Sequence, residues 1–450
     1  MTIPTFKLSL PESPAPLSER LADAILAHAH DLGLNEGDQL PPHRELARRA
    51  GVGLGTVTKA VDLLTRRGLV RGEVGRGTFL AGAAAPGQRG VIDLTLNVPP
   101  QIISRELFLA ASARAAARAL EIPAGGLHDL KGGALQRGTF ADWVSRTRVE
   151  ISADDVLLCV GAQQAIHLAF GDLSERSEVI ACEAATFPGA IAAAANLGLR
   201  LRAVEHDDEG MLPDALEAAL ADGSCAGVYT TPVSQNPLGF ETGEARRREI
   251  LEVCRRRDVA IVEDDIYGLY ASKGSLTYKA LAPDRVYYLT SLSKCLTPLV
   301  RAGLLAPPAE RLAAITRALR AQVYGAAPTA IELACALLEM GLDTMAAKTL
   351  RSEAKARTDL AVHRLGLSAA PMPQGAPHIW LPMPMAEAER LVRRCAEQGV
   401  RLTPPTATAV GGAQAGGVRL SIAAPARRES LEIALDTVAR LLKEPEEVIV

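Results

Sequence analysis

The amino-acid sequence predicts an α/β protein of two parts, in which three short helices and a β-hairpin precede a larger unit with a mainly parallel sheet. Over residues 1–80, amphipathic helical patterns alternate with glycine-bearing turns. From Val91 onward, short apolar runs rich in β-formers alternate with alanine-rich helical segments. The second pattern is typical of a parallel sheet that has helices on both faces.

Length and composition narrow the class of protein. A chain of 450 residues with 48% apolar and 22% charged residues is long enough for two or three globular units and is not disordered by composition. The seven scattered cysteines lack the close pairing of a metal site, so we expect reduced thiols and no metal. No run approaches the roughly 20 apolar residues of a membrane helix, and no signal peptide opens the chain. We expect a soluble cytoplasmic protein with no membrane partner.

Charge is distributed unevenly along the chain. The whole sequence has a formal net charge of -3, which gives no sign of a partner that is a polyanion. The segment from Gln39 to Leu80 is nevertheless locally positive. Its basic residues are Arg44, Arg48, Arg49, Lys59, Arg66, Arg67, Arg71 and Arg76, against Glu45, Asp62 and Glu73.

The first eighty residues predict three helices in order. Residues 17–32 place Leu17, Leu21, Ile25 and Leu26 on one helical face, and Gly33 follows as a stop. A proline pair, Pro41 and Pro42, starts a second short helix over residues 44–47, which turns at Gly51. The third helix, from about Gly55 to Arg67 and ending at Gly68, buries Val57, Ala60, Val61 and Leu64.

A small hairpin follows the third helix. Residues 69–71 and 78–80 are its strands, and residues 72–77 form a glycine-bearing tip. Three helices and a hairpin together make a winged helix-turn-helix. In such a fold the third helix enters the major groove, while the hairpin and the start of the second helix hold phosphates.

Three blocks in this region, LPPHRELARRAGV, TVTKAVDLLTRRGLV and GRGTFL, closely resemble the GntR family of DNA-binding regulators. One departure lies at Gly53, Leu54 and Gly55, where the family offers polar or basic groups, so base readout there is expected to be weak or unusual. The alternative is a helical packing module whose arginines form a solvated face. The resemblance implies the following DNA-binding residues: Arg44, Thr56, Thr58, Lys59, Arg76, Gly77 and Thr78.

A change of pattern marks the domain boundary. Residues 81–90, with the sequence AGAAAPGQRG, are small and without periodicity, which is typical of a short linker. We therefore assign residues 1–80 to the winged helix, 81–90 to the linker and 91–450 to the second domain, with large and small subdomains.

The second domain carries polar groups where its predicted strands end. The strands are VLLCV, EVIACE, AGVYTT, VAIVEDD and RVYYLTS, and ligands of such sheets bind at the carboxyl ends of strands. Gly161-Ala162-Gln163 opens a helix whose free N–H groups can hold a phosphate. Asn236, Asp264-Asp265-Ile266-Tyr267 and Ser291-Leu292-Ser293-Lys294 follow three other strands, with Arg301 beyond them.

This set of side chains suits one cofactor. Pyridoxal 5'-phosphate needs a lysine amine for its Schiff base and a carboxylate that keeps the ring nitrogen protonated. Singly, Lys294 reads as a surface lysine and Asp264 as a turn residue. Their order and wording resemble fold-type I pyridoxal-phosphate enzymes of the class I aminotransferase group over Val91 to Leu442.

The resemblance implies a role for each residue. Lys294 forms the Schiff base, Asp264 pairs with the ring nitrogen, and Asn236 and Tyr267 hold the ring hydroxyl. Phe187 stacks on the ring, and Arg419 binds the α-carboxylate of a ligand, the alternative for Arg419 being a structural ion pair. The residues that the resemblance implies for binding the phosphate are Gly161, Ala162, Gln163, Ser291, Ser293 and Arg301.

The same resemblance implies a homodimer, because the family's site forms at a subunit interface. In the family a tyrosine of the partner subunit reaches the phosphate from the region that corresponds to residues 127–132. Here that region has the sequence LHDLKGG over residues 127–133, so the contact has no counterpart by residue type.

A winged helix joined to an aminotransferase-like domain resembles the MocR subfamily of GntR transcription regulators. The expected function is a pyridoxal-phosphate-dependent regulator that binds promoter DNA and senses a small amine or amino acid, with at most residual transaminase activity. The alternative is an active aminotransferase that carries a DNA-binding head. A third class, a purely structural interaction protein, would not explain why these four residues are present: Lys294, Asp264, Asn236 and Arg419.

Overall fold

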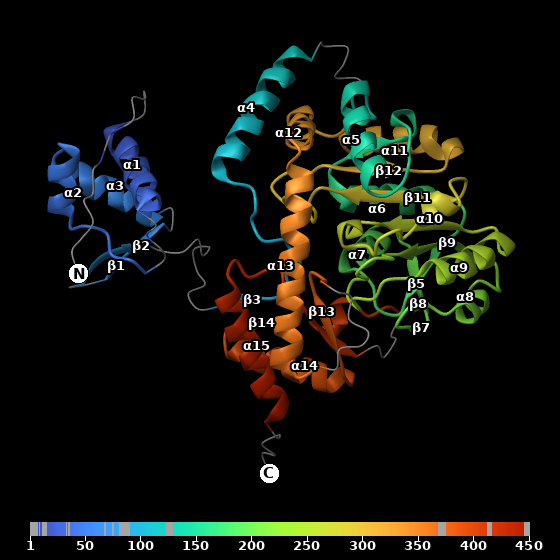
Figure 1. Ribbon diagram of the computed structural model, residues 1–450. Coiled ribbons are helices and arrows are strands. Elements are labelled where there is room, and N and C mark those ends of the chain that lie inside the picture. The colour runs from blue at the N-terminus through green and yellow to red at the C-terminus, as the bar shows by residue number, and fades with distance from the viewer. Residues whose placement is uncertain are drawn as a thin grey trace. The chain divides into compact units, whose positions relative to one another are not determined.

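The computed structural model describes residues 8, 10, 16–32, 34, 37–66, 69–73, 76–80, 91–122, 129–367, 375–411 and 416–444. The chain divides into two compact units, Met1–Val91 and Ile92–Val450 (Figure 1). The predicted linker, residues 81–90, lies outside the described residues, and its boundaries stay a prediction.

The first unit has the helices and hairpin that the sequence predicts. Its elements are α1 (Leu17–Asp31), α2 (His43–Ala50), α3 (Leu54–Arg66), β1 (Val70–Glu73) and β2 (Gly77–Leu80). The two strands are antiparallel, with Val70 opposite Leu80 and Glu73 opposite Gly77. α3 buries the four predicted residues, Val57, Ala60, Val61 and Leu64.

Helix α1 packs through a slightly different face from the predicted one. Leu21 and Ile25 are fully buried, but Leu17 is 43% exposed because it lies at the first turn of the helix. Ala22, Ala24 and Ala29 complete the buried face. Gly51, with φ of 65°, ends α2 as predicted; the predicted stops Gly33 and Gly68 lie outside the described residues.

The second unit is built on a seven-stranded sheet of order β4-β12-β11-β10-β9-β5-β6. Neighbouring strands are parallel except β12, which is antiparallel to both β11 and β4. The strands are β4 (Leu157–Cys159), β5 (Val179–Glu183), β6 (Arg200–Val204), β9 (Cys225–Thr230), β10 (Ala260–Asp264), β11 (Val286–Ser291) and β12 (Gly303–Ala306).

The five strands predicted from the sequence are β4, β5, β9, β10 and β11, and the structure confirms them. Two strands were missed. β6 is an edge strand whose sequence RLRAV is half polar. β12 is a four-residue strand that directly follows the loop after Lys294, so its sequence offers no turn-bounded apolar run.

Helices cover both faces of this sheet (Figure 1). α6 (Gly161–Ser174), α7 (Pro188–Asn196) and α11 (Leu312–Val323) pack on one face. α8 (Pro213–Ala219), α9 (Glu244–Arg256) and α10 (Tyr278–Leu281) pack on the other, beside α4 (Arg105–Glu121), α5 (Ala134–Thr147) and α12 (Pro328–Glu339). Adjacent tyrosines of β11 show the division, because Tyr287 joins the first cluster and Tyr288 the second.

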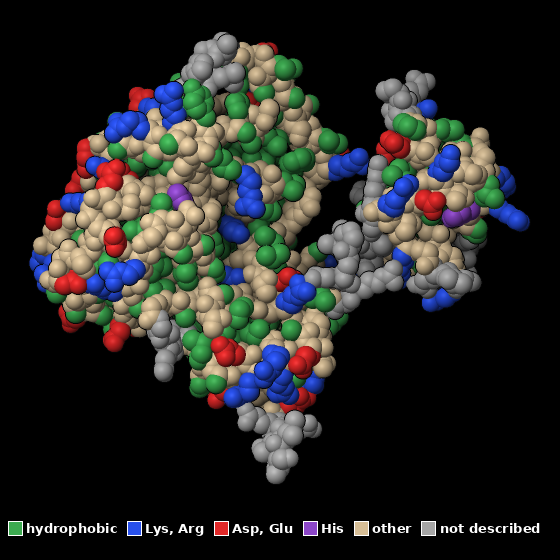
Figure 2. Space-filling model, turned by 180° about the vertical axis from the view of Figure 1, so that it is seen from behind, with side chains coloured by type: hydrophobic (Ala, Val, Ile, Leu, Met, Phe, Trp, Pro, Cys, Tyr) green, Lys and Arg blue, Asp and Glu red, His purple; other side chains and the backbone are tan. Residues whose placement is uncertain are grey.

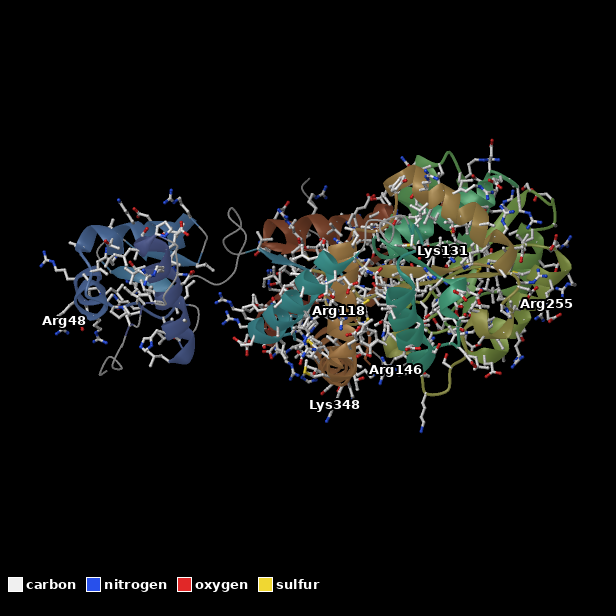
Figure 3. All side chains as sticks on the ribbon, turned by 90° about the horizontal axis from the view of Figure 1, so that it is seen from above. Arg48, Arg118, Lys131, Arg146, Arg255 and Lys348 are labelled. Carbon is white, nitrogen blue, oxygen red and sulfur yellow. The ribbon has the colours of Figure 1, made fainter. Side chains whose placement is uncertain are left out.

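Helix α4 lies against α12, where Arg118 binds Glu339 with both guanidinium nitrogens at 2.8 and 2.6 Å (Figure 3). Short elements complete the large subdomain. They are β7 (His206–Asp207), β8 (Gly210–Met211) and the 3-10 helices η2 (Ala153–Asp155), η3 (Gly268–Tyr270) and η4 (Ala309–Arg311).

The C-terminal residues form a smaller subdomain that also takes in the start of the unit. β3 (Ile92–Asp93) pairs in parallel with β14 (Val400–Arg401), and β13 (Ile379–Pro382) pairs antiparallel with β15 (Gly417–Leu420). A separate core contains Leu94 together with the C-terminal apolar residues. The other elements are α13 (Leu342–Leu365), α14 (Met385–Glu397), η5 (Pro405–Ala407) and α15 (Arg428–Lys443).

Within the described residues, no single helix is both long enough and apolar enough to cross a membrane. One pair of helical segments, Ala309–Val323 and Pro328–Glu339, meets the criterion together by length and composition alone, with a bend of 119° between them. All seven cysteines are free thiols, and six of them are buried.

Candidate functional site

A cavity of about 340 Å³ lies where the predicted site residues converge in the second unit. It is lined by residues at the carboxyl ends of β9, β10 and β11 and by the first turn of α6. Figure 2 shows Lys and Arg side chains within a hollow on one face of this unit. Every predicted cofactor or ligand residue lines the cavity: Gly161, Ala162, Gln163, Phe187, Asn236, Asp264, Tyr267, Ser291, Ser293, Lys294, Arg301 and Arg419.

Lys294 is partly buried in this cavity, and its Nζ donates a hydrogen bond to the backbone carbonyl of Asn97. Burial, together with the positive charges of Arg419 and Arg301, lowers the pKa of Lys294 to about 8, against the opposing effect of Asp264. A lysine amine with such a pKa is neutral in about one molecule in ten at pH 7, far more often than an unperturbed lysine. Lys294 is therefore suited to act as a nucleophile.

Asp264, at the end of β10, is fully buried and has only neutral hydrogen-bond donors around it among the described residues. Tyr229 Oη donates to its Oδ2 at 2.8 Å, and the Ile266 N–H donates to its Oδ1 at 3.2 Å. Burial raises the pKa of Asp264 to about 7, although both hydrogen bonds lower it. A carboxyl group in this position would gain strongly from a cationic partner in the cavity.

Arg419, on β15, reaches the cavity from the small subdomain with 5% of its surface exposed. Its Nη1 donates to Asn236 Oδ1 at 2.7 Å, and its Nη2 donates to the Thr95 carbonyl and to Thr403 Oγ1 at 2.5 and 2.9 Å. Nε has no partner in the part of the chain that the structure describes. Among the described residues Arg419 forms no ion pair with a carboxylate, and its role stays a prediction.

The first turn of α6 closes one end of the cavity. Gly161 has φ of 74°, a conformation that favours glycine, and its neighbours Ala162 and Gln163 begin the helix with no side-chain cap. Ser291 and Ser293 also line the cavity, and the Ser293 N–H donates to Ser291 Oγ at 3.2 Å. Free helix N–H groups, hydroxyls and the exposed Arg301 form a set of donors that suits an anion.

Phe187 forms a wall of the cavity beside Gln163. Gln163 Nε2 donates to the Gly189 carbonyl at 2.7 Å. A Cβ on Gly189 would approach Phe187 to 2.3 Å and Gln163 Oε1 to 2.2 Å. Only glycine at position 189 lets both side chains take these places.

Several cavity residues were missed from the sequence. Thr95, Leu96 and Asn97 come from the segment after β3, while Thr231 and Ile266 flank predicted residues in the chain. Tyr229 lies on β9, two residues before Thr231, and alternation along the strand could have placed it on the Asp264 side. His378 and Asn97 carried no signal, because each lies in a loop far in sequence from the other site residues.

The predicted DNA-binding residues all lie in the first unit. Arg44 is exposed at the first turn of α2, and Thr58 and Lys59 are exposed on α3, whereas Thr56 is half-buried. Arg76 and Gly77 are exposed at the hairpin, and Thr78 is half-buried.

Two arginines of the basic segment are already paired within the unit. Glu45 binds Arg48 at 2.7 Å and Arg49 at 2.5 Å, and these hydrogen bonds lower the pKa of Glu45 to about 2. Arg48 projects outward from the first unit in Figure 3. The positive charge counted from the sequence is therefore partly neutralised along α2.

Gln39 holds the hairpin near its turn. Its Nε2 donates to the Arg76 carbonyl at 2.6 Å, and the guanidinium of Arg76 lies 5.8 Å from the centre of the Phe79 ring. Gly77 has φ of 119°, and a Cβ there would meet Gln39 Nε2 at 2.5 Å. This glycine shapes the turn that presents Arg76.

The predicted gap in the phosphate contacts stays untested. Leu127 and His128 lie outside the described residues. Asp129 Oδ2 accepts a hydrogen bond from Arg137 Nη1 at 2.8 Å, and the Lys131 carbonyl accepts one from the Leu158 N–H at 2.8 Å.

Comparison with known families assigns both units. Residues 90–438 match the model for class I and II aminotransferases, and residues 17–80 match the gntR family of bacterial regulatory proteins. The first match covers more than half of the chain.

Relatives and solved structures agree with these assignments. The uncharacterized HTH-type transcriptional regulator YdeF of Bacillus subtilis is 25% identical over 97% of this chain and 97% of its own length. YjiR of Escherichia coli, another uncharacterized HTH-type transcriptional regulator, is 26% identical over 65% of this chain and 67% of its own.

Among solved structures, the α-aminoadipate aminotransferase LysN of Thermus thermophilus is similar over 79% of this chain and 92% of its own, with 26% identity and a TM-score of 0.69. The LysN crystals contained N-(5'-phosphopyridoxyl)-L-leucine. The fold of the second unit is thus that of an aminotransferase, and this fold implies dependence on pyridoxal phosphate. The chain belongs to the class I and II aminotransferase family, and its N-terminal gntR-type domain makes it a transcription regulator with the domain arrangement of the MocR subfamily.

Proposed function

We propose that this regulator senses a small amine or amino acid through pyridoxal 5'-phosphate held in the cavity of the second unit and acts on promoter DNA through residues 1–80. The observation that carries the proposal is the charge of the cavity. Lys294, Arg301 and Arg419 line it, and none of them forms an ion pair with a described carboxylate. Three cations against the single carboxyl of Asp264 leave an excess of positive charge, which indicates an anionic ligand.

The lining fits the cofactor group by group. Ala162, Gln163, Ser291, Ser293 and Arg301 would hold the phosphate, and Phe187 would stack on the ring. Asp264 would pair with the protonated ring nitrogen, which supplies the cationic partner that this buried carboxyl lacks. Asn236 and Tyr267 would bind the ring hydroxyl. When bound, the cofactor offers an aldehyde carbon for imine formation and a ring that accepts electrons.

Lys294 would attach the cofactor. Its lowered pKa keeps part of the amine unprotonated, and the Asn97 carbonyl accepts its hydrogen, which fixes the position of Nζ. When it is not attached, the Lys294 amine could hold a proton beside the bound ligand.

Arg419 would receive the carboxylate of an amino-acid ligand. A guanidinium has five N–H donors, and the hydrogen bonds of Arg419 to other described residues use three of them. The Nε–H and one N–H of Nη1 have no partner among the described residues, so a carboxylate that enters the cavity can accept a hydrogen bond from the guanidinium. The ligand class favoured by this geometry is an amine that carries a carboxylate.

Sensing requires a difference between two states of the protein. A ligand shifts the regulator only if it binds one state more tightly than the other. The cavity is formed by both subdomains, since Arg419 bridges to Asn236, so ligand binding there can change how the subdomains meet.

We propose that the active form is a homodimer, which the exposed Leu109, Leu120 and Leu135 support. Contact with promoter DNA requires the cytoplasmic location expected from the sequence.

The second candidate is an aminotransferase that turns over while bound to DNA. The completeness of the set Asn236, Asp264, Tyr267 and Lys294 favours it, since Lys294 would form the imine and the other three would hold and polarise the ring. Production of keto acid at a rate that matches ligand consumption would support this candidate. A cofactor signal that changes with ligand and then stays constant would support the sensor.

Reductive trapping tests the cofactor site on the unmodified chain. Borohydride treatment of the protein with pyridoxal phosphate, followed by peptide mapping, should label Lys294. Lys279 is an internal control, because burial lowers its pKa to about 8 as well, but three backbone carbonyls hold its Nζ away from the cavity. Label on Lys279 or on no lysine would refute the site.

The proposed binding of promoter DNA by residues 1–80 is tested separately. A promoter fragment upstream of the protein's own gene or of a neighbouring gene should be shifted at low salt, and the shift should weaken steeply as salt rises. Addition of the effector amine should change the affinity in the wild type and leave it unchanged in Lys294→Ala. The absence of any shift at low salt would overturn the proposed action on these promoters.

A further inference from the structure

Three buried side chains from distant segments form a hydrogen-bonded chain beside the cavity. Asn97 lies in the segment after β3, Tyr267 follows β10, and His378 precedes β13. Asn97 Nδ2 is 2.7 Å from both Tyr267 Oη and His378 Nδ1, and His378 Nε2 is 3.0 Å from the Gln235 carbonyl. Tyr267 belongs to the large subdomain, whereas Asn97 and His378 adjoin strands of the small one.

The Gln235 carbonyl determines where the imidazole of His378 carries its hydrogen. A carbonyl oxygen can only accept, so Nε2 must be the protonated nitrogen. Burial lowers the pKa of His378 to about 3, and the charges of Arg419 and Lys294 act in the same direction. The ring is therefore neutral at physiological pH, and its Nδ1 is an acceptor.

The orientation of Asn97 follows from that of His378. An acceptor at Nδ1 requires the amide nitrogen of Asn97, not its oxygen, to face the ring. The second hydrogen of the same amide nitrogen then points to Tyr267 Oη. The opposite amide orientation would set Oδ1 against an unprotonated ring nitrogen, which is repulsive.

Tyr267 is left with one hydrogen of its own. Burial raises the pKa of Tyr267, so the phenol keeps that hydrogen. Because its oxygen accepts from Asn97 and its side chain lines the cavity, the hydroxyl hydrogen is free to point at a ligand. Without Asn97, the phenol could rotate its hydrogen toward another acceptor.

We propose that Asn97 and His378 are positioning residues that aim the Tyr267 hydroxyl hydrogen into the cavity, toward the ring-hydroxyl oxygen of the cofactor. This inference rests on the proposed function of the cavity. It adds two residues from the small subdomain to the recognition of the cofactor, so that recognition depends on how the two subdomains meet. Substitution of Asn97 leaves its backbone carbonyl, and hence the contact with Lys294, in place.

A double-mutant cycle tests the proposal through Tyr267. The affinity for pyridoxal phosphate is measured by absorbance titration of the full chain for wild type, His378→Met, Tyr267→Phe and the double variant. His378→Met should weaken binding about tenfold when Tyr267 is present, as expected for one misaligned hydrogen bond to a charged oxygen. In the Tyr267→Phe background the same change should alter binding less than about twofold.

A conservative replacement separates positioning from packing. His378→Gln offers one acceptor and one donor at a similar separation, so it should recover most of the lost affinity. Should His378→Met fail to fold, as judged by circular dichroism, Asn97→Leu takes its place in the cycle with the same expectation. Equal losses in both Tyr267 backgrounds, or no recovery with glutamine, would overturn the proposal while the cofactor site stands. A wild type that binds no cofactor would instead overturn the proposed function.

Discussion

The two units place their functional residues in opposite ways. In the first unit the predicted DNA-binding residues lie between Arg44 and Thr78, mostly exposed, on elements that adjoin in sequence. In the second unit the cavity joins Thr95 to Arg419, which are 324 positions apart, and most of the charged or polar lining is buried. A site for a long polyanion can be read from a short stretch of sequence, whereas a site for a small molecule needs the tertiary fold.

Charge compensation differs between Arg419 and two other buried arginines of the second unit. Arg247 and Arg357 are both fully buried, and each has a carboxylate partner, Glu263 at 3.3 Å and Glu353 at 2.7 Å. Arg419 is nearly as buried but contacts only neutral acceptors among the described residues. A buried cation without its own anion is costly, so its presence indicates an anion that arrives from outside.

The largest effect is expected from Arg419→Gln. Loss of a charged hydrogen-bonding partner should weaken binding of an α-amino acid effector by about 2–3 kcal/mol, or roughly 30- to 150-fold. Calorimetric titration of the cofactor-loaded protein measures it. The matching amine without its carboxylate serves as the control, because its affinity should barely change. A similar loss for both ligands would show that Arg419 acts on the fold and would remove the contrast with Arg357.

Gly77→Ala should destabilise the first unit by about 1–3 kcal/mol. The residue has φ of 119°, where side chains other than glycine are strained, and its new Cβ would meet Gln39. Chemical denaturation followed by circular dichroism reports the change. Gly72→Ala in the facing strand is the matched control, since no atom lies within 4 Å of a Cβ there. Equal effects at both positions would show that the hairpin turn is not strained.

Lys59→Ala and Arg44→Ala test the exposed charges of the first unit. Each lost phosphate contact should lower the slope of log affinity against log salt by about one. Fluorescence anisotropy with a promoter fragment gives the slope. Lys348→Ala, an exposed lysine of the second unit, should leave it unchanged (Figure 3). An unchanged slope in both winged-helix variants would place the DNA contact elsewhere.

The smallest effect concerns pH. Because burial and two arginines lower the pKa of Lys294 to about 8, the rate of cofactor attachment should rise with pH through that value as the amine loses its proton. Arg419→Gln removes one of the positive charges and should move the midpoint to higher pH. Stopped-flow absorbance across the neutral and alkaline range measures both. A midpoint unaffected by Arg419→Gln would show that burial alone sets it.

The sequence by itself determined the elements whose signals are local. Helical and alternating patterns predicted α1 to α3, the hairpin and five strands of the large sheet, and the polar residues at strand ends marked most of the cavity. The polar residues meet in one cavity because parallel strands end on the same edge of a sheet, which brings together residues far apart in sequence.

Other features were decided by the tertiary structure alone. β3 pairs with β14 across the whole length of the second unit, and β12 runs antiparallel within an otherwise parallel sheet. The pairing of Asn97 with His378, and of Tyr229 with Asp264, depends on that arrangement. No local pattern encodes such contacts, because a hydrogen bond between buried side chains depends on how separate segments pack together and leaves no periodicity along the chain.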